Sequence, residues 1–351
     1  MISFIAGCLK DGRQHEEVGR IIGVKVYSIE EDLGTTFHAW QEYGINTVFA
    51  DASLLTGEFR SLAKKNHIRV FIILPVFYNP EALQQDTGLY AITDRGQPAA
   101  AEWVEFVCPS RQEYRQQRIE YMKQLVTDLD PDGISLDFIR HFAYWEKIYP
   151  GTHPDSIPEA CFDPSCISAF TEHSGITVPD SLPGVAETAG WINEHCREEW
   201  TAWKCGLITS FIAEASREAK QIRKDILINV HAVPWRQEDF NNAVRRITGQ
   251  EFGEIAPHVD MISPMCYAHM LQRPPEWIHS VVVDLSALVD IPVYPSIQVN
   301  RAYLEESLNV EEFERSLQES LKPPSGGVIF WSWEQLLESP AKKELLKKIQ
   351  E

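Results

Sequence analysis

Long hydrophobic runs are missing from this sequence. A helix that crosses a bilayer needs ~20 apolar residues, and no window of the 351 residues reaches that length. The opening residues, MISFIAGCLKDGRQ, hold too short an apolar stretch, with the wrong flanks, for a secretory signal. The seven cysteines are odd in number, which is more typical of reduced thiols than of a disulfide framework. We therefore expect no membrane span and a cytoplasmic location, although a secreted protein without its signal would look the same.

Positive charge is also scarce. The 32 Lys and Arg residues stand against 51 Asp and Glu, for a formal net charge of −19. A surface of this sign repels phosphate backbones, so nucleic acid is not an expected partner. A neutral or cationic small molecule is compatible with it. With 44% hydrophobic and 24% charged residues, the chain has the composition of a globular protein with ample core material.

Sequence motifs that bind cofactors or metals are absent as well. No G-x-G-x-x-G follows the first candidate strand, as a dinucleotide site would require. No H-x-H follows that strand, and the C-x3-C-x2-C of cluster-bound radical enzymes is missing. Cys161 and Cys166 form a C-x4-C pair without a second pair. We therefore expect neither a metal site nor a cofactor.

What the sequence does contain is a regular alternation of short apolar runs and amphipathic segments. The candidate strands are 21–28, 45–51, 68–78, 132–139, 226–233, 259–267, 291–299 and 326–333. Most are nearly continuous apolar runs, which is typical of strands buried on both faces. The clearest candidate helices are 35–43 before Gly44, 110–129 with Ser110 and Glu113 in capping-box spacing, 198–220, 309–321 with Asn309 as its cap, and 340–350.

Eight strand–helix units in this order predict parallel strands with right-handed crossovers. We predict an α/β fold of the closed (β/α)8 type, a TIM barrel, in preference to a doubly wound open sheet. The whole chain, 1–351, is expected to form this one domain. Two long connections, 79–108 and 142–190, follow the third and fourth strands. Both should lie at the C-terminal face of the barrel, where such folds carry their sites.

Polar and aromatic side chains stand near the ends of the candidate strands. Sugars present apolar C–H faces that pack on indole rings, and hydroxyls that pair with carboxylates, amides and cationic groups. This set of side chains therefore favours a carbohydrate as the small-molecule ligand. The residues expected to bind it are Asp51, Arg140, His141, His231, Trp235, Tyr267, Gln298, Trp331 and Trp333.

Cleavage of a glycosidic bond requires two carboxyl groups, one protonated and one ionised. Asp137 is the first candidate, because strand alternation places Ser135 and Asp137 on one face and Ile134 and Leu136 on the other. Its carboxylate would be the nucleophile or electrostatic stabiliser, held ionised by the nearby Arg140. Asp132, by contrast, begins the strand, so a turn or cap role is expected there.

The second carboxyl group is expected to be Glu334, which follows the sequence FWSW at the end of the last strand. Its position between tryptophans would raise its pKa and suit it to the role of acid. The two roles could be reversed, and Asp51 and Glu146 are the alternatives to Glu334. No residue is expected to bind a metal.

Three segments carry a family resemblance. VCPSRQEYRQQRIEYMKQLVTDLDPDGISLDFIRH (107–141) resembles the "hypothetical glycosyl hydrolase" barrel families, with their D-G-I-x-x-D-[YF]-I-R motif at strand four. ACFDPSCISAFTEHSGI (160–176) is similar to their insert, and VDMISPMCYAHM (259–270) to their strand six. The resemblance implies a (β/α)8 hydrolase acting on glycosides, with Asp137 catalytically important. The sequence departs from chitinase-type barrels, whose proton donor position is occupied here by Ile139.

The expected function is thus that of a glycoside hydrolase. Two alternatives remain open at this point. One is a carbohydrate-binding barrel that lacks catalysis because it has lost one carboxylate. The other is a barrel lyase or hydrolase of another class with His231 or His141 as its base.

Overall fold

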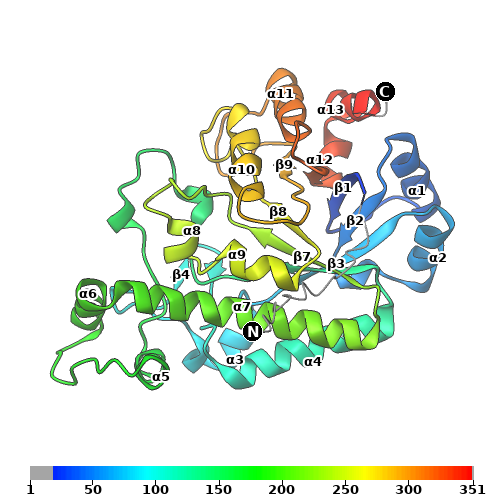
Figure 1. The fold of residues 1–351 in the computed structure, drawn as a ribbon. Helices are drawn as coiled ribbons and strands as arrows, with labels where there is room; N and C mark the ends of the chain where they lie inside the picture. The colour runs from blue at the N-terminus through cyan, green and yellow to red at the C-terminus, as the bar shows by residue number, and fades with distance from the viewer. Residues whose placement is uncertain (1–18, 350–351) are drawn as a thin grey trace, which may run out of the picture.

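The computed structural model describes residues 19–349, whose arrangement Figure 1 shows. These residues are built around a sheet of eight parallel strands. The strands follow the order β8-β7-β6-β3-β2-β1-β10-β9. Parallel bridges from Ile262 to Val293 and from Met265 to Ser296 connect β8 with the β9 segment and bring the two edges of the sheet together. The strands are β1 (Ile21–Val26), β2 (Thr47–Ala50), β3 (Arg69–Pro75), β6 (Gly133–Asp137), β7 (Leu227–Ala232), β8 (Met261–Pro264), β9 (Ser296–Gln298) and β10 (Gly327–Trp331). The predicted (β/α)8 barrel is confirmed.

The alternation along the strands creates two apolar cores. Inside the barrel, Phe49, Phe71, Met261 and Ile329 belong to one buried cluster. Outward-facing side chains, including Ile134 and Leu136, belong to the larger core between the sheet and the helices. A side chain on Gly133 would overlap the Phe71 ring, so β6 can begin this close to β3 only with glycine.

Helices surround the barrel, and the long α7 lies beside α4 (Figure 1). Within residues 19–349, no helix has the length and apolar composition to span a bilayer. The α-helices that cover the strands are α1 (Leu33–Glu42), α2 (Gly57–Lys65), α4 (Gln112–Leu129), α7 (Arg197–Ile222), α8 (Ala243–Arg246), α9 (Phe252–Ile255), α10 (Glu276–Ser286), α11 (Val310–Ser320), α12 (Trp333–Glu338) and α13 (Pro340–Leu345).

Two of the three predicted helix ends are confirmed. The Asn309 side chain accepts a hydrogen bond from the Glu312 N–H at 2.9 Å and caps α11. Gly44 follows α1 with a φ of 70°, the left-handed conformation that ends many helices. The capping role of Ser110 is wrong, because α4 begins later, after Arg111, with no side-chain cap. The Ser110 hydroxyl contacts the thiols of Cys108 and Cys166 instead.

The two long connections have secondary structure of their own. The segment 79–108 contains α3 (Pro80–Gln85) and a short hairpin of β4 (Ala100–Ala101) and β5 (Val104–Glu105). The connection from β6 to α7 contains α5 (Pro164–Ser174) and α6 (Val185–His195). Short 3-10 turns complete the structure: η1 (Ala52–Leu54), η2 (Thr87–Leu89), η3 (Trp145–Lys147), η4 (Pro154–Ser156), η5 (Ala256–His258) and η6 (Leu346–Ile349).

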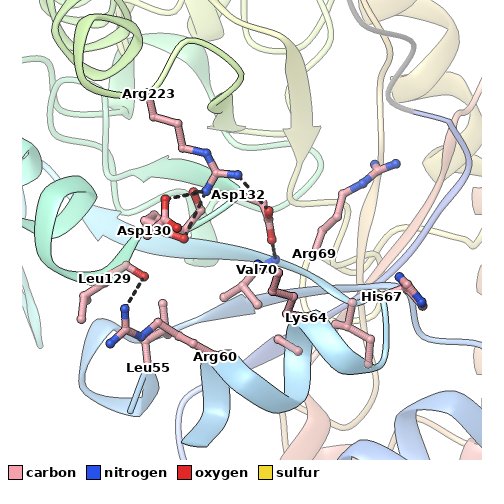
Figure 2. A pocket seen from close by; sticks show the side chains of 13 residues that line it. Leu55, Arg60, Lys64, His67, Arg69, Val70, Leu129, Asp130, Asp132 and Arg223 are labelled. Atoms are coloured by element: carbon pink, nitrogen blue, oxygen red, sulfur yellow. Dashed lines mark hydrogen bonds and ion pairs between the residues drawn. The ribbon is translucent and has the colours of Figure 1, made fainter. Parts of the chain in front are cut away.

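Asp132 lies at the opposite end of the barrel, where the strands begin. Its carboxylate accepts a hydrogen bond from the Val70 N–H at 2.8 Å and faces Arg223 at 3.4 Å (Figure 2). Arg223 also contacts Asp130 at 3.0 Å. A cavity of about 430 Å³ opens beside these groups. Asp132 therefore joins β6 to β3 and to the end of α7, a structural role of the kind expected from its position.

A buried ion cluster fastens the connection after β6 to α7. The Lys204 ammonium on α7 lies 2.8 Å from the Glu159 carboxylate, and Arg246 approaches the same carboxylate at 3.6 Å. Glu159 is only 3% exposed and Lys204 is fully buried. Neither charge has water to replace a lost partner, so the cluster depends on all of its members.

Replacing Lys204 by methionine should therefore lower the free energy of unfolding by about 3–5 kcal/mol, because Glu159 keeps only the more distant Arg246. Chemical denaturation followed by circular dichroism measures this loss. Lys123→Met is the matched control, since the Lys123–Glu120 pair lies at the surface and should contribute little to stability. Equal losses in the two variants would contradict the role of the cluster.

Candidate active site

A cavity of about 290 Å³ opens at the C-terminal ends of the strands. Its walls come from β1, β3, β6, β10, the segment after β8 and the long connections, so residues distant in sequence meet there. The lining residues are Lys25, Tyr27, Ile73, Pro75, Tyr78, Trp103, Asp137, Phe138, Arg140, Trp145, Glu146, Met265, Tyr267, Met270, Tyr303 and Trp331. Two of them, Asp137 and Glu146, are carboxylic acids.

Asp137 is the last residue of β6 and lies half-buried in the cavity wall. One carboxylate oxygen accepts a hydrogen bond from the Phe138 N–H at 2.8 Å. Burial alone would raise the pKa of Asp137. The nearby His231, Lys25, Phe138 N–H and Arg140 outweigh burial and hold this pKa below its ordinary value. Asp137 is therefore ionised at neutral pH.

Lys25 is a charged residue inside the barrel and is only 1% exposed. Its ammonium group contacts His231 Nδ1 at 3.2 Å and the Tyr267 hydroxyl at 3.1 Å. Burial lowers the pKa of Lys25 to about 8, while the charge of Asp137 acts in the opposite direction. The ammonium form therefore predominates at pH 7.

His231 belongs to a polar network beneath the cavity. Burial and the adjacent Lys25 lower the pKa of His231 to about 3, so its ring is neutral at neutral pH. Its Nδ1 atom then accepts a hydrogen bond from Lys25, and its Nε2–H group donates to Ser135 Oγ at 2.7 Å. The positive charge that stabilises ionised Asp137 at this pH consequently comes from Lys25 and Arg140.

Glu146 lies in a different environment, on the 3-10 turn η3 of the connection after β6. It is 7% exposed, and its Oε2 atom has no hydrogen-bond partner among the described residues. Burial raises the pKa of Glu146 to about 7; Arg140 opposes this shift and Asp137 adds to it. The protonated form of Glu146 is therefore populated at neutral pH.

Arg140 influences both carboxyl groups. Its guanidinium lies over the Phe106 ring, 4.7 Å from the ring centre, and donates a hydrogen bond to the Ala143 carbonyl at 2.8 Å. These contacts hold the side chain in a fixed position. Its positive charge favours the ionised form of Asp137 and of Glu146.

Aromatic rings form much of the remaining wall. Tyr267 stacks on Trp331 with ring centres 4.5 Å apart, and Tyr78 stacks on Phe138 at 4.7 Å. The Trp103 indole N–H donates to the Tyr303 hydroxyl at 2.8 Å, which links the connection after β3 to the segment after β9. Tyr27, Trp103 and Tyr303 are 46%, 41% and 39% exposed, although most large apolar side chains of the described chain are buried. Exposed rings at the edge of a cavity are available to a ligand.

Four of the predicted site residues line the cavity: Asp137, Arg140, Tyr267 and Trp331. His231 lies just beneath it. The predicted second carboxylate, Glu334, is not part of the lining. Its Oε1 atom accepts hydrogen bonds from the Tyr27 and Ser28 N–H groups at 2.7 and 2.8 Å. Glu334 therefore holds the segment after β1 in place.

The other predicted site residues take structural positions. Asp51 caps η1 by accepting the Ser53 N–H at 2.9 Å. The remaining four are buried and do not belong to the lining of the cavity. His141 contacts the Lys204 carbonyl, and Trp235 packs on Phe240. Gln298 accepts a hydrogen bond from the N–H of the lining residue Met270, and Trp333 packs on Trp40. Trp333 faces the helices because β10 ends at Trp331 and the alternation of the strand stops there.

Sequence reasoning missed several lining residues, among them Lys25, Trp103 and Tyr303. The position of Lys25 could have been recognised from the sequence, because it is the only charged residue in the apolar run IIGVKV. A lysine buried in a strand requires polar partners, and that requirement points to a polar site. Trp103 and Tyr303 lie in irregular segments whose positions the sequence pattern does not define.

Comparisons with known proteins agree with this fold. A scan against models of protein families gives no match, and no curated protein sequence matches the chain. Among solved structures, the glycoside hydrolase domain of PgaB (BpsB) from Bordetella bronchiseptica superposes with a TM-score of 0.70 at 13% identity, covering 93% of this chain and 98% of that domain.

Two larger enzymes also share the barrel. The β-galactosidase of Rahnella sp. R3 gives a TM-score of 0.66 at 13% identity, over 95% of this chain and 56% of the enzyme. The α-L-fucosidase isoenzyme 2 of Paenibacillus thiaminolyticus gives 0.59 at 10% identity, over 94% and 48%. The chain thus spans about half the length of these two enzymes. At such low identity, these similarities establish the (β/α)8 fold that this chain has in common with glycoside hydrolases.

The charge of Lys25 should control the ionisation of Asp137. In Lys25→Met, we expect the pKa of Asp137 to rise, because the variant loses a positive charge that stabilises the carboxylate. In Lys25→Arg the charge is kept, so the pKa should stay closer to that of the wild type. Carbon-13 NMR titration of the aspartate carboxyl groups, with Asp137→Asn to assign the signal, measures both shifts. An unchanged titration in Lys25→Met would contradict the assignment.

Proposed function

We propose that this protein is a glycoside hydrolase with Asp137 and Glu146 as its working carboxyl groups. The observation that carries the proposal is that both groups line one cavity in opposite electrostatic environments. Asp137 lies near cations that keep it ionised, whereas burial raises the pKa of Glu146 to about 7, so its protonated form is present at neutral pH. One ionised and one protonated carboxyl group are what glycosidic cleavage requires.

The rest of the cavity wall suits a sugar. The stacked Tyr267–Trp331 and Tyr78–Phe138 pairs offer flat apolar faces for the C–H groups of a pyranose ring. Lys25 and Arg140 can donate hydrogen bonds to hydroxyl groups. Two of the structural neighbours, a β-galactosidase and an α-L-fucosidase, are enzymes of this reaction class.

In the proposed reaction, the protonated Glu146 gives its proton to the glycosidic oxygen as the bond to the anomeric carbon breaks. The Asp137 carboxylate stabilises the positive charge that develops on the sugar ring. It then either bonds to the anomeric carbon or removes a proton from the attacking water. Proton NMR of the first-formed product distinguishes these two courses, because the former retains and the latter inverts the anomeric configuration.

Glu146 replaces Glu334 as the second carboxyl group in this proposal. Glu334 uses one oxygen to bind two backbone N–H groups and contributes nothing to the cavity lining. We assign it instead the positioning of Tyr27, whose exposed ring stands at the cavity edge.

Two other functions are less well supported. A carbohydrate-binding barrel without catalysis would need only one carboxyl group, but this cavity holds two. A histidine base would have to reach the substrate. His231 is buried beneath the cavity with both ring nitrogens engaged, and His141 is buried against Lys204.

Asp137→Asn should reduce kcat/KM by about 10²–10³-fold or more, because the charge that stabilises the transition state is lost. Glu146→Gln should reduce it by about 10²–10⁴-fold on substrates with poor leaving groups. With 4-nitrophenyl glycosides the Glu146→Gln loss should be much smaller, because nitrophenolate leaves without a proton. A panel of aryl glycosides and oligosaccharides supplies the substrate. Glu146→Gln with full activity on an unactivated oligosaccharide would refute this role, and Glu334→Gln is the matched control.

The rate should also depend on pH. On the acid side, kcat/KM should fall as Asp137 becomes protonated, at a pH below the ordinary aspartate value. On the alkaline side, it should fall as Glu146 loses its proton, with a midpoint of about 7. In Glu146→Gln the alkaline midpoint at about 7 should disappear, and in Lys25→Arg it should remain. An alkaline limb that Glu146→Gln leaves in place would assign it to another group.

A further inference from the structure

Three cysteines and one aspartate from the two long connections meet in the interior, outside the cavity described above. Cys108 ends the connection after β3, and the other three, Cys161, Asp163 and Cys166, lie at the start of α5. All four are buried, and one ligand atom from each lies within 4.8 Å of the others. The C-x4-C spacing alone did not reveal this set, because Cys108 is more than fifty residues away in the sequence.

The distances within this thiol cluster suit a four-coordinate metal. Cys108 Sγ lies 3.1 Å from Cys166 Sγ, and Asp163 Oδ2 lies 3.0 Å from Cys161 Sγ and 3.6 Å from Cys166 Sγ. Ligands around a tetrahedral zinc ion with Zn–S bonds of about 2.3 Å are separated by about 3.8 Å. Small side-chain movements therefore suffice to enclose an ion.

The two carboxylate oxygens of Asp163 contact different groups. Oδ1 accepts the N–H groups of Ser165 and Cys166 at 2.8 and 3.1 Å and caps α5. Oδ2 faces the thiols. This division fixes the carboxylate so that one oxygen is directed at the centre of the cluster, as a monodentate metal ligand requires.

Donor groups surround the sulfur and carboxylate atoms. The Ile92 N–H points at Cys161 Sγ at 3.2 Å, and the Ser110 hydroxyl lies 3.1 Å from Cys108 Sγ and 3.2 Å from Cys166 Sγ. The Arg111 guanidinium lies 3.2 Å from Asp163 Oδ2. Such outer contacts orient metal ligands and balance the negative charge that thiolates and carboxylate bring together.

We propose that Cys108, Cys161, Asp163 and Cys166 bind one zinc ion. Thiolate ligands favour zinc over magnesium and calcium, and four protein ligands close a tetrahedral site without an open position for a substrate. Zinc binds the thiolate form of each cysteine, so the thiol protons present before binding are released to solvent. A Cys108–Cys166 disulfide would leave Cys161 and the directed carboxylate without a use.

The bound zinc would stabilise the fold and would take no part in the proposed reaction. It joins the connection that carries Trp103 to the connection that carries Glu146, and none of its four residues lines the candidate active site. The inference is therefore independent of the proposed reaction, and it can be tested without a substrate.

The decisive experiment uses the full-length protein purified in reducing buffer. Elemental analysis should find about one zinc per chain. After removal of the metal with a chelator, Co²⁺ should restore one equivalent of binding, with the visible bands of tetrahedral cobalt and thiolate-to-cobalt charge transfer. The melting temperature should fall on chelation and recover with zinc. Less than about a tenth of an equivalent of zinc together with no cobalt bands, or a disulfide in reducing buffer, would overturn the proposal.

Variants locate the site. Cys166→Ser should lose the bound metal, and Asp163→Asn, which preserves a helix cap, should bind zinc at least about tenfold more weakly. Cys205→Ser is the matched control, because Cys205 is a buried thiol outside the cluster. If Cys166→Ser does not fold, the cobalt spectrum of the wild type and the affinity of Asp163→Asn still decide. Equal loss of metal in Cys205→Ser would overturn the assignment.

Discussion

The buried ammonium group of Lys25 is the interaction on which the rest of the site depends. A lysine inside a barrel must regain in contacts what it loses in hydration, and here the contacts come from His231, Tyr267 and the field of Asp137. The same charge determines the state of its neighbours, since it favours ionised Asp137 and neutral His231. Neutral His231 can in turn donate to Ser135 and continue the network into β6. One charge on β1 thus organises side chains on β6, on β7 and after β8.

The pKa values of Asp137 and Glu146 are shifted in opposite directions because the two residues lie in different parts of the fold. Asp137 is fixed at the end of β6, where Lys25 from β1 and Arg140 just after β6 bring positive charge close. Glu146 is mounted on a 3-10 turn of a connection packed with aromatic side chains, so burial dominates its ionisation. Arg140 lies near both and limits how far their pKa values separate. The difference in ionisation between the two carboxyl groups therefore follows from their positions in the fold.

Sequence patterns predicted the barrel well because its strands are continuous apolar runs and its helices carry local caps, as at Asn309. For the same reason they led to Asp137 and Arg140, which do line the cavity, since a polar group directly after such a run must emerge at the strand end. They failed where position depends on contacts between distant segments. Ser110 has the spacing of a cap but pairs with thiols, and Glu334 follows a strand but turns toward the backbone after β1. The sequence offered Glu146 only as an alternative to Glu334, because nothing local predicts that it lines the same cavity as Asp137.

The low-identity similarity to glycoside hydrolases concerns the barrel, and a barrel supports many chemistries. Function must therefore be argued from the side chains that line the cavity, many of which lie on the connections. The connection that carries Glu146 is held to α7 by the buried ion pair between Glu159 and Lys204. A few residues further on, Cys161 to Cys166 hold it to Cys108 of the connection after β3. A carboxyl group on such a connection can hold a defined position only if the connection itself is held rigidly. The buried ion pair and the thiol cluster meet that requirement, because both hold this connection in place. This explains why these buried polar groups lie outside the cavity: they fix the position of a residue that lines it.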